Sequence, residues 1–450
     1  MYKMRLAPKV EEKMLKSDFW TDKLKNEQFL STDEIKEINQ KLFIKAEAEN
    51  KEEYYCDLQQ FAQNFKKNKV SEMIKNTYNS KINADQNYFN LQGELISSDK
   101  RENIKANCSL DNFESTKDRA VKYGILSKRS NIRALPTEMT FAFKKESGDQ
   151  DLLQLTAVSC GSAAVILAAS RDQKWYYIQT KLMRGWVKKD NVALTDSLES
   201  AQAYLNSESF LVVSGSRIET EPSPLDPEIA NRFFQMGDKI PLVEREDSLE
   251  NIPQNHPHGQ SSPGNYLVWL PIKDKNNNLK YKKAVVAASS DVQAGYLKLN
   301  RKNIISQSFK MLGERYDWGG KYQRRDCSRF VMDIYRSFGV ELPRNADLQE
   351  DLSPFENHIL KGDFKKRKGV INKLEAGDIL HMSGHIMLYL GKKENKNYLI
   401  HAASGYGELD EQGNLKSKSI RSVFVMDVEQ LLKNGENTYL NKFSSASKIK

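Results

Sequence analysis

The sequence has few of the residues that build metal sites and disulfide scaffolds. It contains 4 cysteines and 6 histidines in 450 residues, and no two cysteines form a C-x-x-C pair. We therefore predict neither a zinc site nor a disulfide framework. His256 and His258 stand two residues apart, but Pro257 separates them and a third ligand is missing, so we expect no metal and no cofactor. Three isolated cysteines are interpreted as small buried hydrophobic residues: Cys56, Cys108 and Cys160.

Long apolar runs are also absent. No stretch of about 18 consecutive apolar residues exists, so no segment is predicted to span a membrane. The N-terminus is basic but lacks the apolar segment of a secretory signal, which is therefore absent or has been removed. The net charge of +9 favours anionic partners. No recognition-helix or ribonucleoprotein pattern accompanies that charge, so we expect no nucleic-acid partner. The sequence carries no signal for an oligomeric state.

The chain is long enough for several domains. With 450 residues it exceeds the size of one core, and about two to four domains are expected. Residues 1–115 are predicted to be helical. Within them, Ser31 and Glu34 have the spacing of a capping box in front of an amphipathic helix.

Two stretches of short β-type runs follow these helices. Within residues 118–197 the predicted strands are Ala163–Ala169, Trp175–Thr180 and Gly185–Val187. Within residues 200–298 they are Phe210–Ser214, Tyr266–Ile272 and Tyr281–Ala287. Closely spaced short strands are typical of small barrels. The paired endings Gly185-Trp186 and Gly295-Tyr296 indicate two copies of one barrel type.

The stretch from Tyr316 to Phe330 carries the strongest chemical signal. An Asp326-Cys327-Ser328 triplet precedes apolar residues at helical spacing, so we predict a helix that begins at this triplet. Asp326 is the expected cap, which places Cys327 in the first turn. There the positive end of the helix lowers a thiol pKa and favours the thiolate, the nucleophilic form of cysteine.

A β-hairpin downstream supplies histidines. It follows the basic run Lys365–Lys368, which is predicted to be a solvated loop, and its strands are Ile379–Met382, His385–Gly391 and Tyr398–Ala402. If Met387 opposes His401 across a turn of about five residues, His385 and His401 lie diagonally adjacent on one face. A one-residue slip would separate them. In this register His385 can take the thiol proton while His401 orients its ring.

Two further histidines have other interpretations. His381 lies four residues before His385, so along one extended strand it would share that face, and it is an alternative base. His358 stands in a polar stretch without a partner and is predicted to be a surface residue.

Six ordered motifs resemble the NlpC-type cell-wall cysteine peptidases of bacteria: Tyr316-Asp-Trp-Gly-Gly, Asp326-Cys-Ser, Leu342-Pro-Arg, Gly377-Asp-Ile-Leu, Gly384-His-Ile-Met-Leu-Tyr-Leu-Gly and Ile400-His-Ala. Upstream, Arg133-Ala-Leu-Pro136 and Lys174–Val187 are similar to the multidomain branch of that family. The resemblance implies an α+β fold: a helical N-terminal stabilising domain (1–115), two bacterial SH3-like barrels (118–197 and 200–298), and a papain-like catalytic domain (299–450).

The resemblance also implies an activity and a catalytic set. Members hydrolyse the γ-D-glutamyl to diaminopimelate bond of peptidoglycan stem peptides, so peptidoglycan or its stem peptides are the expected partner. Cys327 matches the family nucleophile, His385 the base and His401 the third polar residue. Two other activities stay open: a different papain-like amide hydrolase, such as a muramoyl-L-alanine amidase or an acyltransferase, and a wall-binding scaffold with a silent hydrolase domain.

Substrate-binding residues follow from the same resemblance. Tyr316, Asp326 and Ser328 match positions that recognise a free N-terminal amine on the stem, and Tyr316 is also a candidate donor to the oxyanion. Tyr177 and Trp186 of the first barrel either wall the groove or are buried barrel aromatics. The expected location is the bacterial cell envelope (periplasm or cell wall) if a signal was removed, and otherwise the cytoplasm.

Overall fold

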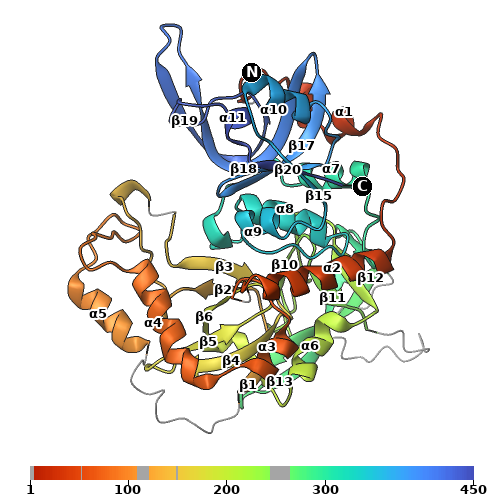
Figure 1. Ribbon diagram of the computed structural model, residues 1–450. Coiled ribbons are helices and arrows are strands. Elements are labelled where there is room, and N and C mark those ends of the chain that lie inside the picture. The colour runs from red at the N-terminus through yellow and green to blue at the C-terminus, as the bar shows by residue number, and fades with distance from the viewer. Residues whose placement is uncertain (1–4, 52, 109–120, 148–149, 244–263, 450) are drawn as a thin grey trace.

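The computed structural model describes residues 5–51, 53–108, 121–147, 150–243 and 264–449. In Figure 1 the C-terminal sheet forms the upper lobe and the two β-rich units form the lower one, with α8 and α9 between them. The mixture of helices and strands confirms the predicted α+β class. Among the described residues, no helix is long and apolar enough to cross a membrane.

The N-terminal helices are distributed over the other parts of the chain. They are α1 (Ser17–Thr21), α2 (Thr32–Ala48), α3 (Leu58–Asn64), α4 (Val70–Lys81) and α5 (Ser98–Asn107). The capping box of Ser31 and Glu34 is confirmed at the start of α2. Trp20 joins the core of the C-terminal unit, whereas Ile74 and Ile104 pack against the first β-rich unit. These helices therefore pack on two different cores, and Leu42 and Ala46 of α2 form a further small cluster with Tyr55 and Leu352. The predicted boundary at residues 115–118 lies outside the described residues, as do His256 and His258.

The first β-rich unit is a seven-stranded sheet with the order β3-β2-β6-β5-β4-β1-β7. Its strands are β1 (Lys122–Leu126), β2 (Ser130–Arg133), β3 (Gln154–Val158), β4 (Ala163–Ala169), β5 (Trp175–Gln179), β6 (Arg184–Lys188) and β7 (Val192–Thr195). The three strands predicted here are confirmed as β4, β5 and β6. Strand β3, which the sequence did not reveal, faces the C-terminal unit. Helix α6 (Leu198–Asn206) follows.

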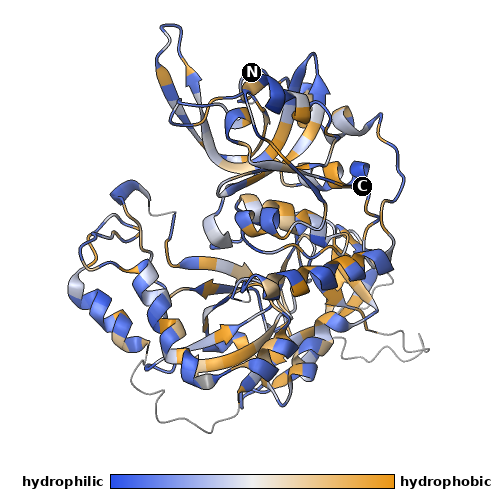
Figure 2. Cartoon of the chain, viewed as in Figure 1, coloured by the Kyte–Doolittle hydropathy of each residue, from blue (hydrophilic) through white to orange (hydrophobic). Residues whose placement is uncertain are grey.

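The second β-rich unit has three small sheets around one core. Their strands are β8 (Phe210–Val213), β9 (Arg217–Glu219), β10 (Phe233–Gln235), β11 (Lys239–Pro241), β12 (Asn265–Lys273), β13 (Leu279–Ala287) and β14 (Val292–Ala294). The three predicted strands are confirmed as β8, β12 and β13. Figure 2 shows that the strands of these units are largely hydrophobic, whereas α5 on the outside is hydrophilic.

The C-terminal unit combines helices with a six-stranded sheet of order β15-β20-β16-β17-β18-β19. The helices are α7 (Arg301–Phe309), α8 (Cys327–Arg336), α9 (Ala346–Asp351), α10 (Phe364–Ile371) and α11 (Tyr439–Lys442). The strands are β15 (Glu356–Ile359), β16 (Ile379–Met382), β17 (His385–Lys393), β18 (Lys396–Leu409), β19 (Leu415–Asp427) and β20 (Ser445–Lys448). One expectation was wrong here: the run Lys365–Lys368 lies in helix α10, with Asp363 as its cap, and not in a loop. His358 lies in strand β15, and its side chain is partly exposed.

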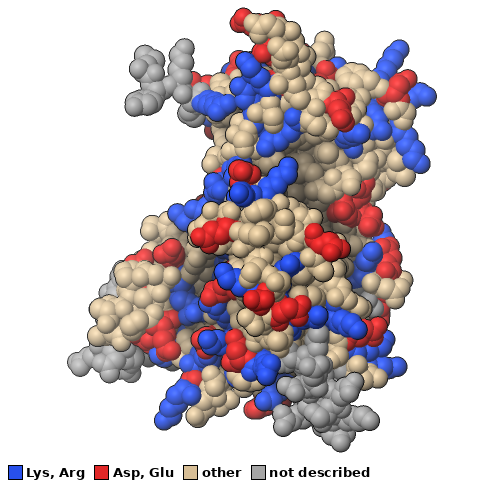
Figure 3. Space-filling model, turned by 90° about the vertical axis from the view of Figure 1, so that its left-hand side faces the viewer, with Lys and Arg blue, Asp and Glu red and all other residues tan. Residues whose placement is uncertain are grey.

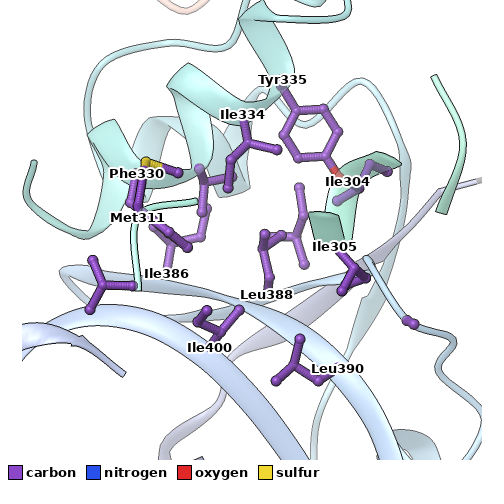
Figure 4. Close-up of a cluster of buried hydrophobic side chains, with 14 of the residues drawn as sticks. Ile304, Ile305, Met311, Phe330, Ile334, Tyr335, Ile386, Leu388, Leu390 and Ile400 are labelled. Atoms are coloured by element: carbon purple, nitrogen blue, oxygen red, sulfur yellow. The ribbon is translucent and has the colours of Figure 1, made fainter. Parts of the chain in front are cut away.

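Helix α8 packs against one face of this sheet. Figure 4 shows Phe330 and Ile334 of α8 above Ile386 and Leu388 of β17 and Ile400 of β18. Because side chains alternate along a strand, the histidines at odd positions point to the other face. That face carries a second buried cluster, which includes Met387, Tyr389 and Leu399.

The register of the β17–β18 hairpin contains one irregularity. Next to the turn, Lys393 pairs with Lys396 and Gly391 with Tyr398. Between Gly391 and Tyr389 the pairing shifts by one residue, so that Leu388 pairs with Ile400. The turn is shorter than the five residues expected, since only Glu394 and Asn395 lie between the paired lysines, and both have positive φ. The shifted ladder is the register that brings His385 and His401 to one face. Without the shift, Leu388 would oppose His401 and the two histidines would point to opposite faces.

The irregularity gives a first prediction. Gly391 has φ 129°, a conformation that costs other residues about 1–3 kcal/mol, while an added Cβ would meet Trp20 only at 3.8 Å. We expect Gly391→Ala to lower the free energy of opening of the β17–β18 amides by about 1–3 kcal/mol, measured by hydrogen exchange. The matched control is Gly369→Ala in α10, where a Cβ meets nothing within 4 Å. Equal exchange in both variants would contradict the account.

Candidate active site

Helix α8 begins at the residue that carries the thiol. Asp326 is its cap: the carboxylate accepts the N–H of Arg329 at 3.0 Å, and Cys327 is the first helical residue. Both features confirm the sequence prediction. The first N–H groups of a helix lack partners within the helix, so the backbone N–H of Cys327 is available to a ligand beside the thiol.

The thiol lies against the start of β17. Cys327 is only 6% exposed, and its Sγ is 4.0 Å from the carbonyl oxygen of Gly384. Burial raises the pKa of Cys327 to about 12, and the nearby Asp326 carboxylate acts in the same direction. The N–H of Ile386 opposes this change without outweighing it. The expectation that the helix end lowers this pKa was therefore wrong for the free protein, because burial dominates.

His385 and His401 form a hydrogen-bonded pair. His385 Nε2 is 2.9 Å from His401 Nδ1, across the shifted ladder of β17 and β18. This contact leaves Nδ1 of His385 as its other ring nitrogen. In the chain His385 stands between Gly384 and Ile386, whose backbone groups border the thiol. Burial lowers the pKa of His385 to about 4, and burial followed by repulsion from His385 lowers the pKa of His401. Both imidazoles are therefore neutral at pH 7.

The other two histidines that the structure describes lie apart from this pair. His381 is on β16, where it pairs with Ile386, so it points away from the face that His385 uses. Its Nε2 is 2.9 Å from the hydroxyl of Ser447, and burial lowers its pKa to about 3. The premise of one continuous strand was wrong, because Ser383 and Gly384 form a turn between His381 and His385. His358 lies on β15, far from the pair in the sheet order, with its Nε2 3.2 Å from Glu356.

Asp326 and Ser328 are engaged by Arg344. The guanidinium donates to both carboxylate oxygens of Asp326, at 2.6 and 3.1 Å, and to the hydroxyl of Ser328 at 2.8 Å. Burial alone would raise the pKa of Asp326, but Arg344 holds it below its ordinary value. The charge of Asp326 is thus neutralised within the protein, and a role for it in binding a substrate amine remains a prediction. The Leu342-Pro-Arg344 motif was the sequence signal for this partner.

Strand β3 of the first β-rich unit holds the thiol-bearing helix. Arg329 of α8 donates to the carbonyl oxygen of Ala157 at 2.7 Å, and Arg344 donates to the hydroxyl of Thr156 at 2.7 Å. Gln154 donates to the carbonyl oxygen of Gly319 at 3.1 Å, in the loop before the helix. Sequence reasoning missed these contacts, because β3 has no motif of its own.

The two barrel aromatics do not wall a groove. Tyr177 is 1% exposed and Trp186 is fully buried, and their ring centroids are 5.1 Å apart inside the first β-rich unit. Their assignment as substrate-binding residues was wrong, since both fill the barrel core.

Tyr316 is half-buried beside the thiol. Burial, with the Cys327 and Asp326 charges, raises the pKa of Tyr316, so its hydroxyl keeps its proton and can donate.

The surface near the site is polar. Figure 3 shows a waist between the upper and lower lobes, with side chains of both charges around it. A hollow of about 690 Å³ lies between the first β-rich unit, residues 90–92 and the loop before α8, from which Lys321 and Tyr322 line it. Neither Cys327 nor His385 lines this hollow.

Comparisons with known proteins identify two domains. Residues 313–426 match the NlpC/P60 family, and residues 140–188 match the SH3 domain of the SH3b1 type. The chain thus carries an NlpC/P60 domain towards its C-terminus and an SH3b domain upstream. An SH3-like domain followed by an NlpC-type domain is what the sequence motifs indicated, and the second SH3-like barrel, at residues 200–298, stays a prediction.

Individual proteins are similar to part or all of this chain. Dipeptidyl-peptidase 6 of Lysinibacillus sphaericus is 30% identical over 118 residues, which are 25% of this chain and 38% of that protein. An NlpC/P60 endopeptidase from Photobacterium damselae subsp. piscicida has 16% identity and a TM-score of 0.72 over 96% of both chains, so the two share a fold. A NlpC/P60 family protein from Bacillus cereus ATCC 10987 has 15% identity and a TM-score of 0.47, over 72% of this chain and 99% of that one.

The pKa of Cys327 gives a prediction about its reactivity. Alkylation by iodoacetamide requires the thiolate, so the rate at Cys327 should keep rising up to pH 10 and not level off near the ordinary thiol pKa of about 8.5. Mass spectrometry of the peptide that contains Cys327 measures the rate at each pH. A rate that is already constant between pH 6 and pH 8 would show a lowered pKa and contradict this prediction.

Proposed function

We propose that this chain is a cysteine peptidase that hydrolyses the γ-D-glutamyl–diaminopimelate bond of peptidoglycan stem peptides through a thioacyl enzyme. The observation that carries the proposal is the arrangement of Cys327 at the start of α8, beside a strand whose His385 is hydrogen-bonded to His401 at 2.9 Å. A nucleophile, a base and a residue that orients the base are the three parts of a cysteine-hydrolase site.

In this mechanism His385 is the base for the first step. Its Nε2–H donates to His401 Nδ1, which leaves the Nδ1 lone pair of His385 to accept the proton of the Cys327 thiol. Neutral imidazole and neutral thiol are the resting forms that their shifted pKa values favour at pH 7. Proton transfer therefore accompanies the attack of sulfur on the γ-carbonyl carbon of D-glutamate.

The negative charge that develops on the carbonyl oxygen during the attack must be stabilised by hydrogen-bond donors. In the proposal this role belongs to the backbone N–H of Cys327 at the start of α8 and to the hydroxyl of Tyr316. The C–N bond then breaks, and the diaminopimelate amine leaves with the proton from His385. Water gives a proton to His385 and attacks the thioacyl carbon, which releases the D-glutamyl product and restores the thiol.

The choice of substrate rests on the domains. An NlpC/P60 domain preceded by an SH3b domain supports a cell-wall peptide as substrate. The names of the similar proteins, a dipeptidyl-peptidase and an endopeptidase, support a peptide bond as the target. The same site in a muramoyl-L-alanine amidase would cleave at the other end of the stem. A wall-binding scaffold would not cleave at all.

The proposal predicts a specific product. L-Ala-γ-D-Glu-diaminopimelate should be cleaved to L-Ala-D-Glu and free diaminopimelate, which mass spectrometry identifies. Cys327→Ala should abolish cleavage, and His385→Ala should lower kcat by on the order of a hundred- to ten-thousand-fold. His381→Gln is the matched control, since His381 points away from the face that His385 uses and is hydrogen-bonded to Ser447, and it should keep the activity of the parent.

Two results of this assay would contradict the proposal. One is cleavage by Cys327→Ala at the parental rate. The other is a parent enzyme that leaves the tripeptide intact but releases the stem from muramic acid, as an amidase would. Running the tripeptide beside intact sacculi shows which form of the substrate is used, and hence whether the enzyme fits the cell envelope or the cytoplasm.

A further inference from the structure

We propose that the rings of Phe424 and Tyr439 fix the tautomer of His401 and thereby keep Nδ1 of His385 free to accept the thiol proton. This inference rests on the proposed function, because it assigns positioning residues to the same site. It concerns the free protein, however, and can be tested without any substrate.

His401 is enclosed by rings. It is fully buried, and Phe424 stands directly opposite it in the β18–β19 ladder. The ring centroids of His401 and Phe424 are 4.6 Å apart with an interplanar angle of 63°, and those of His401 and Tyr439 are 5.6 Å apart with an angle of 73°. Both contacts are edge-to-face. His401 Nε2 has no hydrogen-bond partner among the residues that the structure describes.

The hydrogen bond between the two histidines can carry its proton in two ways. In the productive arrangement His385 Nε2–H donates to His401 Nδ1, so His401 carries its own proton on Nε2 and His385 has a lone pair on Nδ1. In the other arrangement His401 Nδ1–H donates to His385 Nε2, and the proton of His385 sits on Nδ1. That second form cannot accept a proton from Cys327.

The surroundings of His401 Nε2 decide between these forms. An aromatic ring has a negative face and a positive edge, so a ring face attracts an N–H group and repels a lone pair. Nε2 has no hydrogen-bond partner, neither donor nor acceptor, in the described part of the chain, so no hydrogen bond selects either form and the electrostatics of the neighbouring rings decide. A pocket of aromatic rings therefore favours the Nε2–H form of His401, which is the productive one.

Tyr439 is held in this position by its own hydrogen bond. Its hydroxyl donates to the carbonyl oxygen of Gly405 at 3.1 Å, and its ring centroid is 6.3 Å from that of His385. Tyr439 belongs to α11 and lies beyond residues 313–426, which match the family. The C-terminal segment of this chain thus contributes a ring to the site.

The test reads the tautomers directly. Long-range ¹H–¹⁵N correlation spectra of protein labelled with ¹⁵N-histidine report which ring nitrogen carries the proton. In the parent we expect one pattern, with the proton of His401 and that of His385 both on Nε2. Phe424→Leu and Tyr439→Leu should each add a second pattern, with the protons of both histidines on Nδ1. In each variant kcat should fall in proportion to the fraction of molecules that show this second pattern, while KM stays unchanged.

Two controls separate this role from general packing. Tyr439→Phe keeps the ring and should keep the parental pattern. Tyr406→Leu removes a buried ring that lies 6.0 Å from Phe424 but is not packed on His401, and it should also keep that pattern. A proton on Nδ1 of His401 in the parent would overturn the proposal, as would an unchanged single pattern in both Phe424→Leu and Tyr439→Leu. If the tautomers behave as expected but no peptide is cleaved, the proposed function fails and this inference about the histidine pair stands.

Discussion

The hydrogen bond between His385 and His401 depends on a single shift in the β17–β18 ladder. The tight turn at Glu394 and Asn395 would place the histidines on opposite faces, and the irregularity between Tyr389 and Gly391 moves them to the same one. One residue of register thus decides whether the base has a partner. The same shift leaves the other face free for Ile386 and Leu388, which pack against α8. The position of Cys327 beside β17 follows from that packing.

The second constraint is the attachment of the thiol-bearing helix to the β-rich units. Buried arginines connect them: Arg329 reaches Ala157 of the first unit, and Arg325 reaches the carbonyl oxygen of Ser216 in the second at 2.6 Å. Asp333 on α8 accepts from Arg325 and Arg329 at 2.8 and 2.6 Å, which neutralises its buried carboxylate. Removing one member of such a network leaves a buried charge without compensation. The two β-rich units are therefore part of the support of the site.

The sequence predicted what local patterns determine. The cap at Asp326, the start of α8 at Cys327 and the strands around His385 follow from side-chain spacing. The pKa of Cys327 could not be predicted, because a helix end alone lowers it while burial by distant segments raises it. Of the two interpretations of Tyr177 and Trp186, the groove was wrong, because both side chains fill the barrel core. Periodicity shows which residues share a face and does not show which face of a barrel is inside.

The measurement that tests the account most directly is the detection of the covalent intermediate. The protein is mixed with L-Ala-γ-D-Glu-diaminopimelate, quenched in acid within one turnover, digested and examined by mass spectrometry. The account predicts an L-Ala-D-Glu acyl group on the peptide that contains Cys327. Release of diaminopimelate with an acyl group on any other residue would contradict it.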